Sequence, residues 1–436
     1  MTPPDNHEVD GNQHVDGSQH LDDSTTGSVS IEDAATDLAA LPVVRIKPRR
    51  ALPFFARHPW VFAGAIESIE GQPDVGDEVL LTTDDGEPIA RGLFNPHSNI
   101  RVRLYEWDAD VALDADFFTR QIRSAISLRR RLFPEFHDRL ACRLINSEGD
   151  GLSGLTVDRY GPWLLLQITS LAMAHRRDDI VRILQQELEP QGIWLRTEKG
   201  IRDAEGLDQQ DGLIAGAEPT RPYFIEENGL QFGIDLLQGQ KTGYYLDQRD
   251  NRLAVSRYLD GLRVLDAFCY SGGFGLTALR RGNAANVLAI DSSEPALDLA
   301  RNNAELNGLG SRIEFQRENV YQALERLQSE GRQFEAVILD PPKLARHRSG
   351  VAQAIKGYHS LNRLAVELIP PGGLLISCSC SGHVSRDQFA EMLGSVGMRT
   401  RRSIQILEQR GHAADHPISA HCPESNYLKC FICRVL

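Results

Sequence analysis

The second half of the chain alternates between short apolar runs and amphipathic helical stretches, and this alternation constrains the fold more than any other feature. A strand, a helix and a second strand in succession predict a right-handed crossover, which makes the two strands parallel neighbours in one sheet. Strands of such a sheet are covered on both faces, so their composition is almost continuously apolar. The predicted strands are residues 263–268, 287–291, 313–316, 334–340 and 373–379, and the predicted helices are residues 275–281, 295–307, 320–329, 352–368 and 386–396. Two later β-rich runs, 403–409 and 427–435, predict an antiparallel pair at the end of this α/β sheet.

The chain is too long to form this doubly wound domain alone, because 436 residues exceed one ordinary domain. Short strand patterns separated by Gly, Pro and Asp predict a small β-barrel, with strands at residues 43–46, 61–66, 78–81, 89–94 and 100–104. An amphipathic helix is predicted over residues 116–134, with Asp114 or Asp116 as its cap. A glycine-rich turn over residues 146–158, a strand at 163–168, a helix at 175–188 and a strand near Ile193 follow. We therefore expect a barrel over residues 41–115, an α+β middle domain over 116–222 and the α/β domain over 223–436.

The net charge of −13 at first argues against nucleic acid as a partner, because an acidic protein has no general attraction for phosphates. Residues 1–40, however, hold nine of the 60 acids and no Lys or Arg, which leaves 51 acids against 47 bases in the rest of the chain. These 40 residues contain no aromatic residue, so we expect a disordered acidic tail, and the His and Asp residues in its loose repeat do not fix a metal geometry.

The composition also bears on the compartment. No run of 18 uncharged apolar residues and no secretory signal pattern is present, and seven cysteines are too few for a disulfide framework. We therefore expect a cytoplasmic protein with free thiols.

Three segments concentrate basic residues. They hold Arg45, Lys47, Arg49, Arg50 and Arg57 with His58; Arg120, Arg123, Arg130 and Arg131, with Arg129 nearby, on the outer face of the helix over 116–134; and Lys343, Arg346, Arg348, Lys356 and Arg363. Each segment is either a solvated face or a surface that binds RNA phosphates. As RNA contacts we select Arg49, Arg50, Arg130, Arg131 and Lys343.

A glycine turn between Asp266 and Gly275 follows the first strand of the predicted α/β sheet, where open sheets of this kind bind ligands. The turn lacks the GxGxxG spacing of a nicotinamide fingerprint. Asp291 ends the second strand, where a carboxylate can accept hydrogen bonds from both hydroxyls of a ribose. Asp291 can also cap the helix that begins at Glu294, and the two roles are compatible. The turn, the acid and the alternation together predict a nucleoside site.

The fourth strand ends in Asp340-Pro341-Pro342-Lys343, which is either a rigid loop or part of a site for a flat base. Enzymes that methylate exocyclic amines usually carry an aromatic residue after this Pro-Pro pair, so Lys343 disfavours that chemistry.

Two cysteines mark the end of the fifth strand. Alternation along a strand places Cys378 and Cys380 on the same side, and Cys378 is interpreted as a structural thiol. Cys380 lies at the carboxyl end, where a thiolate can act as a nucleophile. A zinc site built on Cys430 and Cys433 is disfavoured, because residues three apart in a strand face opposite sides.

Five motifs in this order carry a family resemblance. They are Lys241 to Arg249, the glycine turn, Asp340 to Lys343, Ser379 to Gly382 and Ala413 to Pro417. Over residues 41–436 they resemble the RlmI-like family of bacterial S-adenosylmethionine-dependent methyltransferases, which make 5-methylcytosine in large-subunit (23S) ribosomal RNA. The resemblance implies a PUA domain that binds RNA, an α+β middle domain and a Rossmann-like catalytic domain.

The resemblance also implies roles for single residues. The cysteine of the Ser-Cys-Ser-Gly motif falls on Cys380, the expected nucleophile, and Asp340 is expected to assist at the base. Lys343 stands where many RNA cytosine methyltransferases have a second cysteine, so the base that removes the carbon 5 proton stays unidentified. The expected S-adenosylmethionine contacts are Gln248, Arg249, Phe268, Tyr270, Ser271, Gly272, Asp291, Ser292, Asn319 and Asp340.

Two other functions stay open from the residues alone. One is methylation of a purine nitrogen in RNA, which the Asp-Pro-Pro motif permits. The other is a non-catalytic RNA-binding protein whose Rossmann-like domain only senses the cofactor. Ribosomal RNA is the expected partner. Assembly into a homodimer is left open, and no bound metal is expected.

Overall fold

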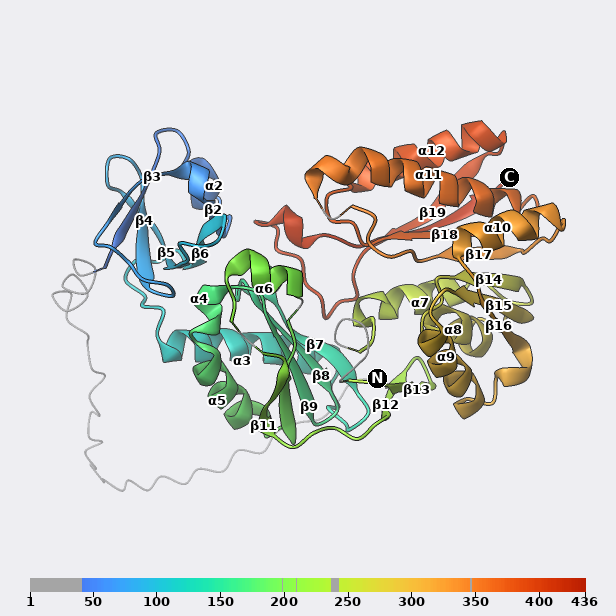
Figure 1. Cartoon of the computed structure of the whole chain (residues 1–436), viewed down its shortest axis with the longest axis horizontal. Coiled ribbons are helices and arrows are strands. Elements are labelled where there is room, and N and C mark those ends of the chain that lie inside the picture. The colour runs from blue at the N-terminus through green and yellow to red at the C-terminus, as the bar shows by residue number, and fades with distance from the viewer. Residues whose placement is uncertain (1–40, 198, 209, 237–242, 346) are drawn as a thin grey trace, which may run out of the picture. The chain divides into compact units, whose positions relative to one another are not determined.

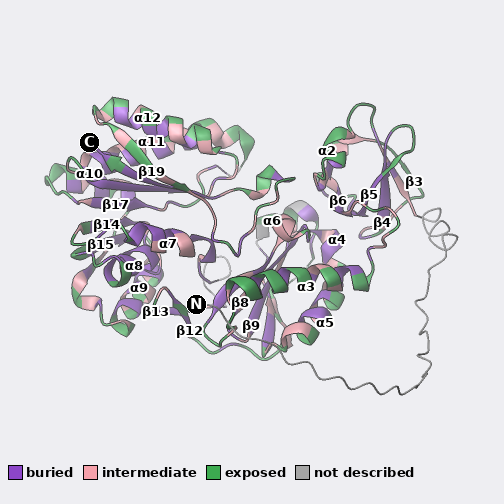
Figure 2. Ribbon diagram, turned by 180° about the vertical axis from the view of Figure 1, so that it is seen from behind, coloured by how far each residue is buried: buried purple, intermediate pink, exposed green. Residues whose placement is uncertain are grey.

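The computed structural model describes residues 41–436 except 198, 209, 237–242 and 346. The acidic tail, the first two residues of the Lys241 motif and Arg346 therefore lie outside the described residues. Residues 41–436 form one compact unit, which contains three larger sheets and a hairpin. Figure 1 shows these elements, and Figure 2 shows how the buried residues line the sheets and the inner faces of the helices.

The first sheet has six strands in the order β2-β6-β5-β4-β1-β3. Its elements are β1 (Val43–Ile46), α2 (Leu52–Phe55), β2 (Trp60–Phe62), β3 (Ile66–Glu70), β4 (Glu78–Thr82), β5 (Pro88–Phe94) and β6 (Ile100–Glu106). The predicted strand over residues 61–66 is wrong as one strand, because a 3₁₀ turn over Ala63–Ala65 separates β2 from β3. Alternate strand residues such as Val44, Val79 and Val102 enclose a separate small core.

The middle segment packs helices against a five-stranded sheet in the order β11-β10-β9-β8-β7. Its elements are α3 (Ala115–Leu132), β7 (Ala141–Asn146), β8 (Leu155–Tyr160), β9 (Trp163–Ile168), α4 (Leu171–Ala174), α5 (Arg177–Leu188), β10 (Gly192–Leu195), α6 (Lys199–Glu205) and β11 (Gly212–Gly216). Helix α3 begins where the Asp114 carboxylate accepts a hydrogen bond from the Phe117 backbone N–H, so Asp114 is the cap of the two that the sequence offered.

Arg129 lies next to the basic outer face of α3 in the sequence but does not belong to that face. Its neighbours Arg130 and Arg131 are exposed, but the Arg129 side chain is fully buried. The guanidinium makes two parallel hydrogen bonds to the Asp150 carboxylate, at 2.6 and 2.8 Å, and a third to the Asp415 carbonyl oxygen at 2.7 Å. The helical periodicity around Phe118, Ile122 and Ile126 turns this position inward, so Arg129 holds the middle segment to a loop near the C-terminus.

The last segment is the doubly wound sheet that the sequence predicts. Its strands are β14 (Arg263–Ala267), β15 (Asn286–Asp291), β16 (Ile313–Arg317), β17 (Ala336–Leu339), β18 (Leu374–Ser379), β19 (Ile404–Arg410) and β20 (Lys429–Val435). They lie in the order β16-β15-β14-β17-β18-β20-β19. The first five strands are parallel, while β20 is antiparallel to both β18 and β19, which confirms the predicted antiparallel pair.

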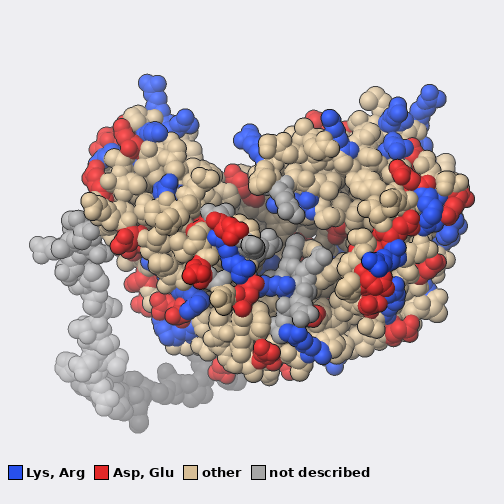
Figure 3. All heavy atoms as spheres, in the orientation of Figure 1, with Lys and Arg blue, Asp and Glu red and all other residues tan. Residues whose placement is uncertain are grey.

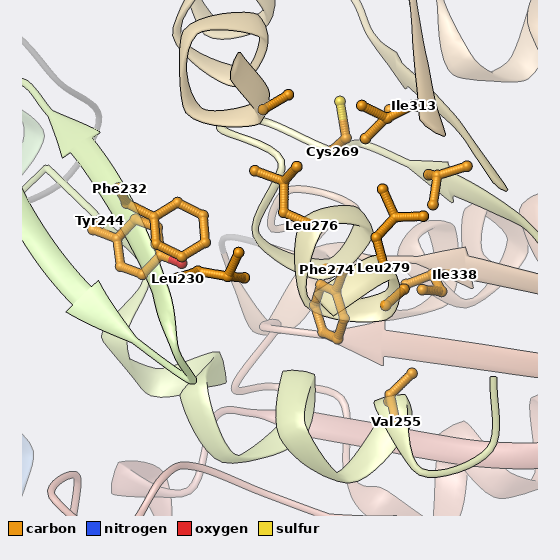
Figure 4. Packing of buried hydrophobic residues seen from close by; sticks show 14 of the residues in the cluster. Leu230, Phe232, Tyr244, Val255, Cys269, Phe274, Leu276, Leu279, Ile313 and Ile338 are labelled. Atoms are coloured by element: carbon orange, nitrogen blue, oxygen red, sulfur yellow. The ribbon is translucent and has the colours of Figure 1, made fainter. Parts of the chain in front are cut away.

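Helices cover both faces of this sheet (Figure 1). One face packs against α7 (Arg249–Ser256), α8 (Gly273–Arg281) and α9 (Glu294–Leu306), and the other against α10 (Val320–Ser329), α11 (Val351–Glu367) and α12 (Arg386–Thr400). A hairpin is formed by β12 (Tyr223–Glu227) and β13 (Leu230–Ile234). It adds Phe232 to the core between the sheet and helices α7, α8 and α9, beside Tyr244 and Leu276 (Figure 4). Within the described part of the chain, no helix combines the length and apolar character needed to cross a bilayer.

Arg129 offers a matched test of this architecture. Arg129→Met should lower the free energy of unfolding by about 3–5 kcal/mol, because it leaves the buried Asp150 carboxylate without its cation. Arg130→Met, one position along the same helix but exposed, should change it by less than about 0.5 kcal/mol. Urea unfolding of both variants measures the difference, and equal stabilities would contradict the structural role given to Arg129.

Candidate functional site

The glycine turn after β14 holds an unusual backbone. Phe268 and Tyr270 have φ angles of 65° and 46°, and Gly272 has 84°. Left-handed conformations at two bulky residues are strained and persist where the surrounding structure fixes them, often at ligand sites. The turn leads into α8, so backbone N–H groups gather at the carboxyl end of the first strand.

Asp291 braces this turn from the end of β15. One carboxylate oxygen accepts a hydrogen bond from the Tyr270 backbone N–H at 3.0 Å, and the other accepts one from the Ser293 backbone N–H at 2.9 Å. The cap of α9 is Ser293, whose hydroxyl accepts from the Ala296 N–H, so the alternative of Asp291 as that cap is wrong. Asp291 is only half-buried, and each of its oxygens has a further lone pair available to a ligand hydroxyl.

Asp266 lies beneath the turn and is buried. Its carboxylate accepts a hydrogen bond from the Gly275 backbone N–H at 2.8 Å, and a Cβ at Gly275 would lie 3.0 Å from the same oxygen. Burial raises the pKa of Asp266 to about 7, the Gly275 hydrogen bond opposes this rise, and the charges of Asp340 and Asp291 add to it. Three carboxyl groups therefore meet at the ends of neighbouring strands.

Asp340, at the end of β17, is oriented by a chain of amides. The Gln248 side-chain N–H₂ donates to an Asp340 oxygen at 3.0 Å, and the Asn251 side chain donates to the Gln248 oxygen at 2.6 Å. Gln248 and Asn251 are buried, whereas Asp340 is half-buried just after the end of β17. Of the residues predicted from the sequence, the structure therefore brings together Gln248, Asp340, Asp291 and the glycine turn.

Cys380 follows the last residue of β18 and is half-buried, with its Sγ 4.0 Å from the Pro341 carbonyl oxygen. Cys378 is fully buried and is paired across the strands with Cys430. Because β18 ends at Ser379, strand alternation alone does not fix the direction of Cys380, and the expectation that both thiols share a side stays a prediction. Cys430 and Cys433 belong to the two opposite cores of the sheet, which confirms that they face apart.

Hydroxyl groups hold the backbone around Cys380. The Tyr358 hydroxyl lies 3.0 Å from the hydroxyls of both Ser379 and Ser381. The Ser381 hydroxyl also accepts hydrogen bonds from the backbone N–H groups of Leu344 and Ala345. The loop after β17 and the loop after β18 are thus joined next to the thiol.

Other predicted contacts occupy different places. The Arg249 guanidinium donates to Asp415 and to the Ala141 carbonyl oxygen and stacks over Phe133, so it joins segments of the fold and is not directed into the crevice. Ser292 is exposed beside Asp291. Asn319 is exposed and caps α10, where its side-chain oxygen accepts hydrogen bonds from the N–H groups of Tyr321 and Gln322.

The predicted RNA contacts are exposed, and charges of both signs are interspersed over the surface seen in Figure 3. Arg49, Arg50, Arg130, Arg131 and Lys343 all lie at the surface. Several of their basic neighbours are paired instead: Arg45 with Glu70, Arg123 with Glu187 and Arg363 with Glu367. These three pairs reduce the cationic character expected of each segment.

Sequence reasoning missed the groups that surround Cys380 from β20 and the preceding loop. Lys429 is buried, with its Nζ 2.6 Å from the Ser381 carbonyl oxygen and 2.9 Å from that of Tyr427. The Tyr427 hydroxyl donates to Asp247 at 2.7 Å, and burial lowers the pKa of nearby His412 to about 4. The available signal for Lys429 was a lysine directly before the apolar run from Cys430 to Cys433.

One cluster has spacing suited to a metal ion. The ligand atoms of His58, Cys422 and Glu424 lie within 4.8 Å of one another. Burial raises the pKa of Cys422 to about 12, so its thiol keeps its proton and faces Glu424 at 3.6 Å. The His58 ring meets the same carboxylate at 3.3 Å, and we assign this cluster a structural role.

The chain matches known proteins along most of its length. Residues 208–418 match the S-adenosylmethionine-dependent methyltransferase family, and residues 44–107 match the PUA-like domain. Proteins named ribosomal RNA large subunit methyltransferase I are similar over 87% of this chain: that of Erwinia tasmaniensis is 41% identical, with 96% of its length covered, and that of Aeromonas hydrophila is 42% identical, with 95% covered.

Solved structures show the same fold. A Streptococcus mutans protein assigned as a SAM-dependent methyltransferase superposes with a TM-score of 0.76 at 20% identity, and a methyltransferase structure complexed with SAH gives a TM-score of 0.78 at 20% identity. Each alignment covers 90% of this chain and 99% of the other chain.

The buried Asp266 carboxyl should make stability depend on pH. Its folded pKa of about 7 lies above the usual aspartate value of 3.8, so its contribution to stability is fully present below about pH 4 and is lost as the pH rises to about 7. Asp266→Asn should therefore gain stability relative to the wild type over this window, by at most about 1.4 kcal/mol per pH unit. Urea unfolding at several pH values measures the difference, with the exposed Asp298→Asn as the control. A difference that does not change with pH would contradict the protonated state of Asp266.

Proposed function

We propose, from the premise that the chain belongs to the family of the ribosomal RNA large subunit methyltransferases I, that it transfers a methyl group from S-adenosylmethionine to carbon 5 of a cytosine in 23S ribosomal RNA through a covalent adduct on Cys380. The observation that carries this proposal is the position of the half-buried Cys380 beside the Asp340 loop, at the same edge of the sheet as the glycine turn. A nucleophile, a base-contacting carboxylate and a nucleoside-binding turn then share one crevice.

The crevice residues fit the cofactor. The turn from Phe268 to Gly272 brings backbone close to a ligand, and Asp291 keeps lone pairs for ribose hydroxyls while it holds the Tyr270 N–H. Gln248, Tyr270, Ser271, Gly272, Ser292, Asn319 and Asp340 complete the proposed contacts. When bound, S-adenosylmethionine supplies an electrophilic methyl group.

Cytosine carbon 5 is a poor nucleophile, and a thiolate changes this. The Cys380 sulfur forms a bond to carbon 6, the electron pair of the 5,6 double bond moves to carbon 5, and carbon 5 then takes the methyl group. Loss of the carbon 5 proton restores the double bond and breaks the bond between carbon 6 and sulfur. Asp340, held by Gln248, hydrogen-bonds the base and assists as charge develops on its ring nitrogen.

The RNA-binding surface is proposed from the same premise. Arg49 and Arg50 extend from the PUA-like segment, Arg130 and Arg131 from the end of α3, and Lys343 from the loop beside Cys380. They contact phosphates and not base edges, so they position the RNA without reading its sequence. The target base must also leave its stack to reach the crevice, at a cost of a few kcal/mol. We keep the division into 41–115, 116–222 and 223–436, and a cytoplasmic location, as parts of this proposal.

Asp291 provides a test of the cofactor site. Asp291→Ala should weaken binding of S-adenosylmethionine by tenfold or more, because hydrogen bonds to a charged group contribute about 1.5–3 kcal/mol. Asp298→Ala, on the exposed side of α9, is the matched control and should bind normally. Isothermal calorimetry on the isolated protein measures both, and unchanged affinity in Asp291→Ala would remove this residue from the site.

Cys380 provides the test of the reaction. Cys380→Ala should abolish methyl transfer while cofactor affinity stays near that of the wild type, since the thiol acts on the base. Cys378→Ala should retain activity with a packing cost of about 1–2 kcal/mol. Mass spectrometry of nucleosides from treated ribosomal RNA identifies the product.

RNA that contains 5-fluorocytidine sharpens this test, because its fluorine cannot leave as a proton does. A stable adduct should form with the wild type and with Cys378→Ala but not with Cys380→Ala. An adduct that depends on Cys378 would identify the other thiol as the nucleophile. Methylation of an exocyclic nitrogen without an adduct would replace this proposal with purine methylation.

A further inference from the structure

Lys429 is a buried lysine that the proposed reaction does not yet use. It is the first residue of β20 and pairs across the sheet with Ser379, the residue before Cys380. Its side chain reaches past the end of β18, where Nζ donates to the Ser381 carbonyl oxygen, so the amino group lies beside the backbone on both sides of Cys380. Only 2% of Lys429 is exposed, and lysines are rarely buried to this extent without a compensating charge.

The charged groups around Lys429 identify that compensating charge. Both hydrogen-bond acceptors, the carbonyl oxygens of Ser381 and Tyr427, are neutral. The pKa of Lys429 is lowered to about 8: burial lowers it most, the negative charge of Cys380 raises it, and the charges of Arg386 and Lys343 lower it. The titratable groups near the pair also include His412, Tyr427, Tyr245, Tyr358, Asp247 and Asp340. Burial keeps the histidine neutral and the tyrosines protonated. Asp247 accepts a hydrogen bond from the Tyr427 hydroxyl, and Asp340 accepts one from Gln248.

We propose that Lys429 acts through Cys380: its neutral amine accepts the thiol proton, and the resulting ammonium stabilises the thiolate for attack on the base. This rests on the proposed function of Cys380. The S–H bond breaks and its electron pair stays on sulfur, while the proton forms a new N–H bond at Nζ. The neutral amine has two N–H donors, which the two carbonyl oxygens accept, and one lone pair for the incoming proton.

The acidities of the two groups suit this transfer. An ordinary thiol has a pKa of about 8.5, close to the value of about 8 for Lys429, so moving the proton between them costs little free energy. After the transfer, the Lys429 ammonium and the Cys380 thiolate attract each other, and this attraction is stronger in a site with little water, which favours the thiolate further. A purely structural lysine, which only joins β20 to the loop after β18, would leave the acidity of Cys380 unchanged.

The rate of thiol alkylation against pH separates these two roles. We would treat the full chain with iodoacetamide between pH 6 and 10 and follow the peptide that contains Cys380 by mass spectrometry. The wild-type thiol should titrate about one unit or more below an ordinary thiol. Lys429→Met should raise the apparent pKa by about one unit, which makes alkylation at pH 7 about tenfold slower.

Two further variants keep the test decisive. Lys429→Arg retains the positive charge and should keep the low thiol pKa, and Lys356→Met, an exposed lysine on α11, should leave the thiol profile as in the wild type. If Lys429→Met does not fold, as judged by loss of cofactor binding, the wild-type profile still decides: a Cys380 that titrates at or above 8.5 overturns the proposal. An unchanged profile in a folded Lys429→Met also overturns it.

The 5-fluorocytidine adduct distinguishes failure of this inference from failure of the proposed function. Lys429→Met should form the Cys380 adduct about tenfold more slowly than the wild type at pH 7 and recover most of the rate at pH 9, where solvent deprotonates the thiol. Equal rates at pH 7 in a folded variant would overturn the role of Lys429 while the nucleophile stands. Absence of a Cys380 adduct in the wild type would overturn the proposed function, whatever the alkylation profile.

Discussion

The buried Asp415 carboxylate is the interaction on which the arrangement around the crevice depends. It accepts hydrogen bonds from the Arg143 backbone N–H and from Arg249, and it lies 3.1 Å from the His416 ring nitrogen. Burial alone would raise its pKa, but Arg249 and His416 hold the pKa of Asp415 well below its usual range. A carboxylate this deep in the protein is stable only while its partners stay in place, so three distant parts of the chain are fixed to one another.

The contacts of Asp415 also hold the residues of the proposed site in place, because few residues separate the two. Arg249 directly follows Gln248, so the ion pair that fixes Arg249 also fixes the amide that orients Asp340. The loop that carries Asp415 is further tied to this segment where the Ala413 N–H donates to the Asp247 carbonyl oxygen, and Tyr427 donates to the Asp247 carboxylate. Tyr427 in turn accepts from Lys429 beside Cys380. The middle segment thus supports the crevice although it contributes none of the proposed reacting groups.

The sequence predicted what periodicity and strand-end position determine, and little of what depends on tertiary pairing. Buried parallel strands have a distinct apolar pattern, so all five were located, and the edge that gathers Asp291, Asp340 and Cys380 followed from their order. The buried role of Arg129 was not predicted, because its partners Asp150 and Asp415 lie 21 and 286 residues away in the sequence. Ser293 displaced Asp291 as the cap because a cap depends on local backbone angles. The Lys429 ammonium meets Ser381 only because β20 returns antiparallel beside β18.

The three carboxyl groups at the strand ends give the crevice a chemical preference of its own. Asp266, Asp291 and Asp340 lie close enough that the charges of the latter two raise the pKa of the first. Because Asp266 holds its proton below about pH 7, the negative field comes from Asp291 and Asp340, and it favours a cationic ligand over a neutral one of the same shape. The sulfonium of S-adenosylmethionine is positive, whereas the thioether that remains after methyl transfer is neutral. In the proposed site, the same carboxylates that favour binding of the methyl donor therefore lose their attraction for the product once the methyl group has moved, which favours its release.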